Sequence, residues 1–156
     1  GLVFLPYMSG ERSPIWDPYA KGVYYGLDFS KTKGHFVRAA MEGVALSLRH
    51  NLDVALEAGA TVSELRSMGG SANSLLWTQM KSDVTGKKIT TLGAVILAGV
   101  GVGMYKDFEE AVDRTVVIKR HHEPNPDVWA AYDKNYKVYL KLYENLKDLM
   151  RQKGEE

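Results

Sequence analysis

The residues best suited to hold a ligand lie in a glycine-containing turn near the middle of the chain. Gly69 and Gly70 follow a short strand-like run at 65–68 and precede a helical pattern. Because glycine has no Cβ, the backbone can turn sharply there and a flat or charged group can lie directly against it. Serine and asparagine cap helices, and the free N–H groups of a helix start favour a polar or anionic ligand. The sequence therefore predicts a ligand site at Gly69, Gly70, Ser71, Asn73 and Ser74.

Each polar feature of the sequence also has a purely structural interpretation. A capped strand-to-helix turn that binds no ligand would have the same composition as 69–74. Glu11 and Arg12 could act as an acid and a cation, but adjacent opposite charges without a partner base more often fix a loop. His121 and His122 could begin a metal site, yet no third and fourth ligand follow at a suitable spacing. We therefore expect a loop-fixing network at Glu11 and no metal ligand set in this chain.

The composition limits the class of protein and its partners. With 156 residues, 45% of them hydrophobic, the chain can bury one core. Lys and Arg number 20 against 19 Asp and Glu, so neither a nucleic acid nor an anionic membrane surface is favoured as a partner. The absence of cysteine excludes disulfides and thiolate chemistry and fits a cytoplasmic protein. No apolar run approaches the length of a membrane span, which leaves small molecules and proteins as partners.

The elements that must position the turn follow an α/β pattern. From Phe36 to Leu56 apolar residues recur at four-residue steps, which predicts a long helix. Ser30 or Thr32 can cap its start, and Gly59 lies where a left-handed residue commonly ends a helix. The other expected elements are strands at 2–5, 22–27, 116–118 and from 87 onward, a helix through Leu76, Met80 and Val84 that ends at Gly86, a small-residue helix at 92–100, and a final helix that starts at Asn125.

The final helix carries a stripe of aromatic residues at steps of three and four. Such a stripe could stack nucleic-acid bases, but no basic groove accompanies it. We therefore expect it to dock the helix on its own domain. Its members are Trp129, Tyr132, Tyr136, Tyr139 and Tyr143.

Taken together, three segments of the chain resemble the carboxy-terminal part of the FGGY carbohydrate kinases, which include xylulose, gluconate, ribulose and glycerol kinases. Residues 4–18 contain Ser-Gly-Glu-Arg-Ser-Pro, similar to a loop of the xylulose and gluconate kinases. Residues 22–27 and 35–42 match the family's second signature position by position. Residues 69–74 resemble the family's adenosine motif, with Ser71 where glycine is usual.

The resemblance implies an α/β fold of the ribonuclease H-like, actin-like ATPase type, with a sheet flanked by helices. In this family two such domains close on a cleft, and ATP with Mg2+ phosphorylates a sugar hydroxyl. Residues 1–156 would be the carboxy-terminal, nucleotide-binding domain. Gly69, Gly70 and Ser71 would lie against the adenine, with Asn73 and Ser74 at the base or ribose edge. The catalytic aspartate, the phosphate loops and the sugar pocket are expected upstream of Gly1.

The resemblance favours D-xylulose as the sugar, with gluconate or another FGGY substrate as the alternative. The expected partners are the sugar, ATP and the protein's own amino-terminal domain, with a second copy of the chain as a further candidate. Two other functions remain open: an actin-like regulatory domain without a sugar substrate, and a structural or oligomerisation module whose glycine turn binds nothing. If the protein is a kinase for D-xylulose, gluconate or another sugar, the isolated chain is expected to be inactive.

The connection after the strand that begins near Lys87 is expected to be interrupted. The family carries a loop, often with a glutamate, before its small-residue helix, but residues 88–92 leave almost no room for one. Strand-to-helix connections usually need about two to six residues. We therefore expect a loop to be missing from the sequence between Ile89 and Thr90, so that the chain is broken at this step.

Overall fold

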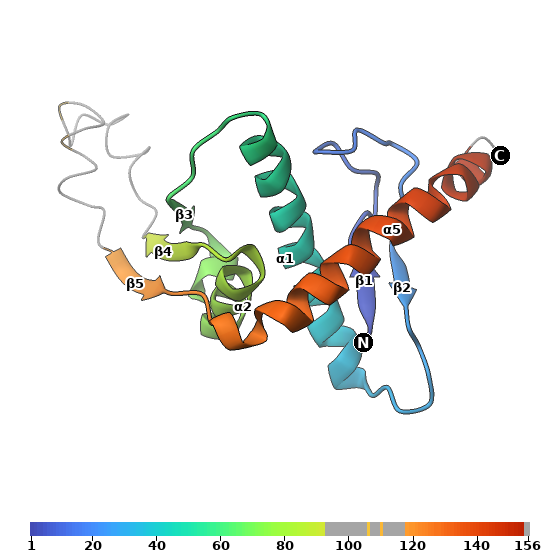
Figure 1. The fold of residues 1–156 in the computed structure, drawn as a ribbon, viewed down its shortest axis with the longest axis horizontal. Coiled ribbons are helices and arrows are strands. Elements are labelled where there is room, and N and C mark those ends of the chain that lie inside the picture. The colour runs from blue at the N-terminus through green and yellow to red at the C-terminus, as the bar shows by residue number, and fades with distance from the viewer. Residues whose placement is uncertain (93–105, 107–109, 111–117, 155–156) are drawn as a thin grey trace.

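A computed structural model of the protein describes residues 1–92, 106, 110 and 118–154 (Figure 1). Helices and short strands alternate along this part of the chain, as the α/β pattern predicts. The elements, in chain order, are β1 Val3–Leu5, β2 Val23–Tyr25, α1 Lys33–Glu57, β3 Glu64–Ser67, the 3-10 helix η1 Gly70–Asn73, α2 Leu75–Thr85, β4 Lys88–Leu92, β5 Ile118–His122, the 3-10 helix η2 Pro126–Val128 and α5 Trp129–Gly154.

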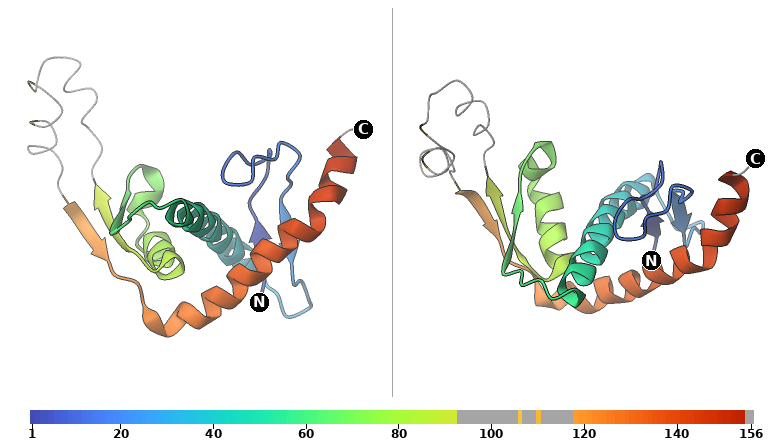
Figure 2. Two further views of the ribbon diagram at one scale, coloured as in Figure 1. Left: turned by 45° about the horizontal axis from the view of Figure 1, so that its top comes forward. Right: turned by 90° about the horizontal axis from the view of Figure 1, so that it is seen from above.

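The strands form two small sheets. In the first sheet β1 and β2 are antiparallel, and in the second β4 lies between a parallel β3 and an antiparallel β5. Figure 2 shows α1 and α2 side by side between the two sheets, with α5 running past α2, α1 and β1. None of the helices in the described part of the chain is long and apolar enough to cross a membrane.

The long helix α1 begins and ends where the sequence predicts. Thr32 is its N-cap, and the Thr32 N–H donates to His35 Nδ1 at 3.1 Å. At the other end Gly59 has a φ of +89°, and its N–H donates to the Leu56 carbonyl at 2.9 Å. On the face that packs on β1, a Cβ at Gly43 would lie 2.4 Å from the Phe4 carbonyl oxygen. Only glycine permits this close approach of helix and strand.

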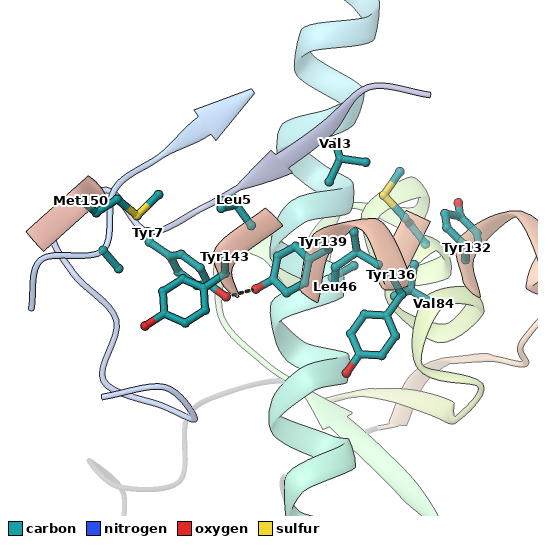
Figure 3. Close-up of a cluster of buried hydrophobic side chains, with 13 residues drawn as sticks. Val3, Leu5, Tyr7, Leu46, Val84, Tyr132, Tyr136, Tyr139, Tyr143 and Met150 are labelled. Atoms are coloured by element: carbon teal, nitrogen blue, oxygen red, sulfur yellow. Dashed lines mark hydrogen bonds between the residues drawn. The ribbon is translucent and has the colours of Figure 1, made fainter. Parts of the chain in front are cut away.

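The core is built around the aromatic stripe of α5 (Figure 3). Tyr139 is fully buried, and its hydroxyl is hydrogen-bonded to the Tyr7 hydroxyl. Burial is the main reason that the pKa of Tyr139 rises to about 12. The predicted docking role of the stripe is thereby confirmed, except that Trp129 stays partly exposed and lies under the Arg49 guanidinium, 4.5 Å from its ring centroid. The buried members are Tyr132, Tyr136, Tyr139 and Tyr143.

The predicted interruption between Ile89 and Thr90 is wrong. Strand β4 runs through both residues, with Ile89 opposite Leu65 of β3 and Thr90 opposite His121 of β5. Thr90 and Thr91 are β-branched residues that suit a strand, and both are buried between the neighbouring strands. The small-residue helix expected at 92–100 falls almost entirely outside the described residues, as does most of the strand expected at 116–118.

Candidate functional site

The predicted turn lies between β3 and α2 and brings the candidate ligand residues into one short segment. Gly69 has a φ of +83°, in the left-handed region that favours glycine. The chain then forms the 3-10 helix η1, and α2 begins only at Leu75. Ser74 is therefore the N-cap of α2, since its Oγ accepts from the Trp77 N–H at 3.3 Å. Ser71 lies inside the 3-10 turn and does not cap the α-helix. The sequence pattern did not predict this extra turn before α2.

The two glycines face open space. A Cβ added to Gly69 or Gly70 would meet no atom within 4 Å. Gly69 needs its glycine for backbone reasons, but Gly70 has no positive φ. The packing of the described residues therefore gives no reason for glycine at position 70, whereas a flat ligand lying on the turn would give one.

Polar groups of the turn remain available to a ligand. The Asn73 side chain is exposed and makes no hydrogen bond to any described residue. Lys81 of α2 reaches the turn from the other side, where its Nζ donates to Ser71 Oγ at 3.2 Å and lies 4.5 Å from the Trp77 ring centroid. Desolvation by burial lowers the pKa of Lys81, and no described carboxylate forms an ion pair with it. The turn therefore has a cation at one side and an unpaired amide at the other.

Apolar side chains border the same turn. Met68 before it and Leu75 and Leu76 after it are exposed, although all are large and hydrophobic. Apolar side chains at the border of a turn are suited to cover the flat face of a ligand that lies on it. A cavity of about 530 Å3 lies elsewhere, at the Ser9–Pro18 loop, whereas one of about 310 Å3 adjoins the turn. The cavity beside the turn is lined by Leu48, Leu65, Arg66, Ser67, Met68, Ser71, Lys81 and Ile89.

Sequence reasoning missed two cations at this site. Lys81 is one of many lysines on amphipathic helices, and nothing in its spacing marks it. Arg120 is 48 residues from Ala72 along the chain, yet its Nη2 donates to the Ala72 carbonyl at 3.1 Å. A contact of this range depends on the pairing of β5 with β4, which the sequence pattern did not predict.

The Ser9–Pro18 loop is fixed by its own carboxylates. Glu11 Oε1 accepts from the N–H groups of Arg12 at 2.8 Å and Ser13 at 3.2 Å, which confirms the expected loop-fixing role. The buried Asp17 accepts from the Tyr143 hydroxyl at 2.8 Å. Desolvation opposes the ionisation of Asp17, but the hydrogen bonds from Tyr143 and from the Tyr19 N–H lower its pKa overall. Arg12 and Trp16 are exposed over the cavity of this loop.

The histidine pair has structural partners within the sheet region. His122 Nδ1 lies 3.1 Å from Gln79 Oε1, and His121 Nδ1 lies 3.2 Å from Thr90 Oγ1. Burial is the main reason that the pKa of His122 is lowered. Within the described residues no group of three or more His, Cys, Asp or Glu side chains could hold a metal ion.

Comparisons with known proteins agree on one family. Residues 1–104 match the carboxy-terminal domain of the FGGY family of carbohydrate kinases. The xylulose kinase of Staphylococcus epidermidis is 34% identical over 96% of this chain and 32% of its own length. The gluconokinase of Bacillus subtilis is 33% identical over 96% of this chain and 30% of its own length. The chain thus spans about a third of the length of these curated relatives.

Solved structures give the same result for the fold. The crystal structure of xylulose kinase from Rhodospirillum rubrum superimposes with a TM-score of 0.80 at 30% identity, and the match covers 97% of this chain and 32% of that one. The α/β fold of the actin-like ATPase type, expected from the sequence motifs, is therefore confirmed. On the evidence of both the family match and the fold, this chain belongs to the FGGY family of carbohydrate kinases.

Proposed function

We propose that this chain is the nucleotide-binding domain of an ATP-dependent sugar kinase, with D-xylulose as the first candidate substrate. The observation that carries the proposal is the open glycine turn at 69–74, in a chain whose relatives include xylulose kinases. Because the chain covers only a third of those relatives, the complete reaction requires the remainder of the protein.

The proposed roles of the turn residues follow from their chemistry. Adenine is flat and largely apolar on its faces, so it can lie on the backbone of Gly69, Gly70 and Ser71, where no Cβ from either glycine intervenes. Asn73 and Ser74 supply amide and hydroxyl groups for the base or ribose edge. The exposed apolar side chains beside the turn provide further cover for the base.

Phosphoryl transfer needs a metal ion and a catalytic base in addition to the residues of the turn. Mg2+ bound together with ATP would supply charge neutralisation at the phosphates. The catalytic aspartate that accepts the proton of the attacking hydroxyl is proposed to lie upstream of Gly1, in the amino-terminal partner domain.

Gluconate is the second candidate substrate, because the gluconokinase relative is almost as similar to this chain as the xylulose kinase is. The assay is coupled ATP turnover by the full-length protein, with D-xylulose, gluconate, ribulose and glycerol offered in turn. We expect the highest kcat/KM with D-xylulose. A clear preference for gluconate would replace xylulose by the second candidate.

Titration with a non-hydrolysable ATP analogue separates the kinase from the other two functions. Saturable binding with no turnover of any sugar would favour an actin-like regulatory domain. Absence of binding to the full-length protein would favour a structural or oligomerisation module and would refute the proposed role of the turn.

A further inference from the structure

We propose that Arg120 is a positioning residue for the nucleotide turn, an inference that rests on the function proposed for that turn. Arg120 lies in β5 and is partly buried. Its Nη2 donates to the carbonyl oxygens of Ala72 at 3.1 Å and Asn73 at 3.4 Å. One guanidinium group thus joins the last strand of the sheet to consecutive carbonyls at the end of the turn.

These carbonyls need a donor from outside the turn. The turn itself is closed by the Ser74 N–H, which donates to the Ser71 carbonyl at 3.2 Å. The first main-chain bond of α2 uses the Ser74 carbonyl, which accepts from the Thr78 N–H at 3.0 Å. The carbonyls of Ala72 and Asn73 therefore lie between two helices, where carbonyls lack helical partners. A charged guanidinium is a stronger donor to them than a neutral group would be.

The rest of the Arg120 environment does not explain its position. No described carboxylate forms an ion pair with it, and its Nε is buried without a hydrogen-bond partner. An unpaired buried donor is unfavourable, so such groups persist where another contact requires them. The bonds from Arg120 to the turn are that contact.

Arg120 fixes the direction of two consecutive peptide groups at the end of the turn. In a trans peptide the N–H points opposite to the carbonyl. With the carbonyls of Ala72 and Asn73 held toward Arg120, the Asn73 N–H points away from it, and the Ser74 N–H stays available for its bond to the Ser71 carbonyl within the turn. Asn73 and Ser74 are the residues proposed for the base or ribose edge. Removal of Arg120 would leave the side chains of Asn73 and Ser74 intact but would free the turn that positions them to change its conformation.

The test measures steady-state kinetics of the full-length kinase with three variants. Arg120→Met removes both hydrogen bonds, Arg120→Lys keeps one charged donor, and Lys134→Met removes a charge from an exposed position of α5 as a control. Loss of charged hydrogen bonds predicts a rise in KM for ATP of about tenfold in Arg120→Met. The sugar KM should stay constant, kcat should change less than the KM for ATP, and Arg120→Lys should recover most of the ATP affinity. Lys134→Met should resemble the wild type.

Several outcomes would overturn the proposal. An unchanged KM for ATP in Arg120→Met, an equal rise in both KM values, or no recovery by lysine would show that Arg120 does not position this turn. If Arg120→Met fails to fold, Arg120→Gln replaces it; its neutral amide is a weaker donor than the guanidinium, so the KM for ATP should still rise, by less than tenfold. If the wild type phosphorylates no sugar, the proposed function fails, and titration with an ATP analogue decides the role of Arg120 instead. Equal analogue affinity in wild type and variant would then refute the inference.

Discussion

Replacement of Gly70 by valine tests whether the open turn is a nucleotide site. The structure separates the effect on the fold from the effect on a ligand at this position. A Cβ at Gly70 would meet no protein atom within 4 Å, and Gly70 has no positive φ. A side chain there would occupy space that the protein leaves open, and this is the space proposed for adenine.

The expected magnitudes differ between stability and binding. Where the backbone conformation is compatible, substitution of glycine changes the free energy of unfolding by only about 0.4–1 kcal/mol. A branched side chain inserted into a close contact costs about 1–3 kcal/mol, which corresponds to a loss of ATP affinity of roughly 5- to 150-fold. Gly70→Ala adds a single carbon and should give a smaller loss than Gly70→Val.

The assay is calorimetric titration of the full-length protein with an ATP analogue and, separately, with the sugar. Lys134→Met serves as a control, because Lys134 is an exposed residue of α5 that lines none of the proposed site. We expect unchanged sugar affinity in all three variants and unchanged ATP affinity in the control. Unaltered ATP affinity in Gly70→Val, or loss of sugar affinity with ATP affinity retained, would refute the assignment of the turn.

Three other predictions concern stability and the isolated chain. Gly43→Ala should lower the free energy of unfolding by about 1–3 kcal/mol, because its Cβ would lie 2.4 Å from the Phe4 carbonyl oxygen. Urea titration measures this change. An unchanged unfolding midpoint would contradict the close packing of α1 on β1. Asp17 has a lowered pKa in the folded protein, so the ionised carboxylate stabilises the fold. This contribution to the free energy of unfolding is fully present above the ordinary pKa of 3.8 and is lost as pH falls through the folded pKa. Asp17→Asn should therefore be less stable than wild type at neutral pH, and thermal unfolding should show this difference shrinking in acid; a difference independent of pH would contradict the reasoning. The isolated chain of 156 residues should show no sugar-dependent ATP hydrolysis, since the proposed catalytic base lies outside it, and turnover above background in a pure sample would disprove that placement.

Local signals in the sequence were sufficient for the helices and for the position of the turn. The four-residue spacing in α1, the cap at Thr32 and the glycine at 59 depend on neighbours within a few residues, so they can be read without a tertiary structure. The tyrosine stripe of α5 is similar, because a periodic apolar face implies a buried face even when its partner is unknown.

Contacts between distant segments could not be predicted in the same way. The bond from Arg120 to Ala72 exists because β5 pairs with β4 and thereby reaches η1, a consequence of strand order. The predicted interruption between Ile89 and Thr90 was wrong for a related reason. It relied on the loop pattern of relatives, whereas β4 is held on both sides by β3 and β5.

Helix α5 connects the region of the nucleotide turn with the Ser9–Pro18 loop. It follows β5, the strand of Arg120, and in its second half Tyr143 donates to the buried Asp17 of the Ser9–Pro18 loop at 2.8 Å. Lys21, just after that loop, donates its N–H to the Met150 sulfur at 3.4 Å. Because one helix supports both regions, a cavity-forming substitution on its buried face, such as Tyr139→Ala, should loosen both together. Reduced ATP binding in such a variant would therefore reflect lost packing, whereas the substitutions at Gly70 and Arg120 act on the turn itself.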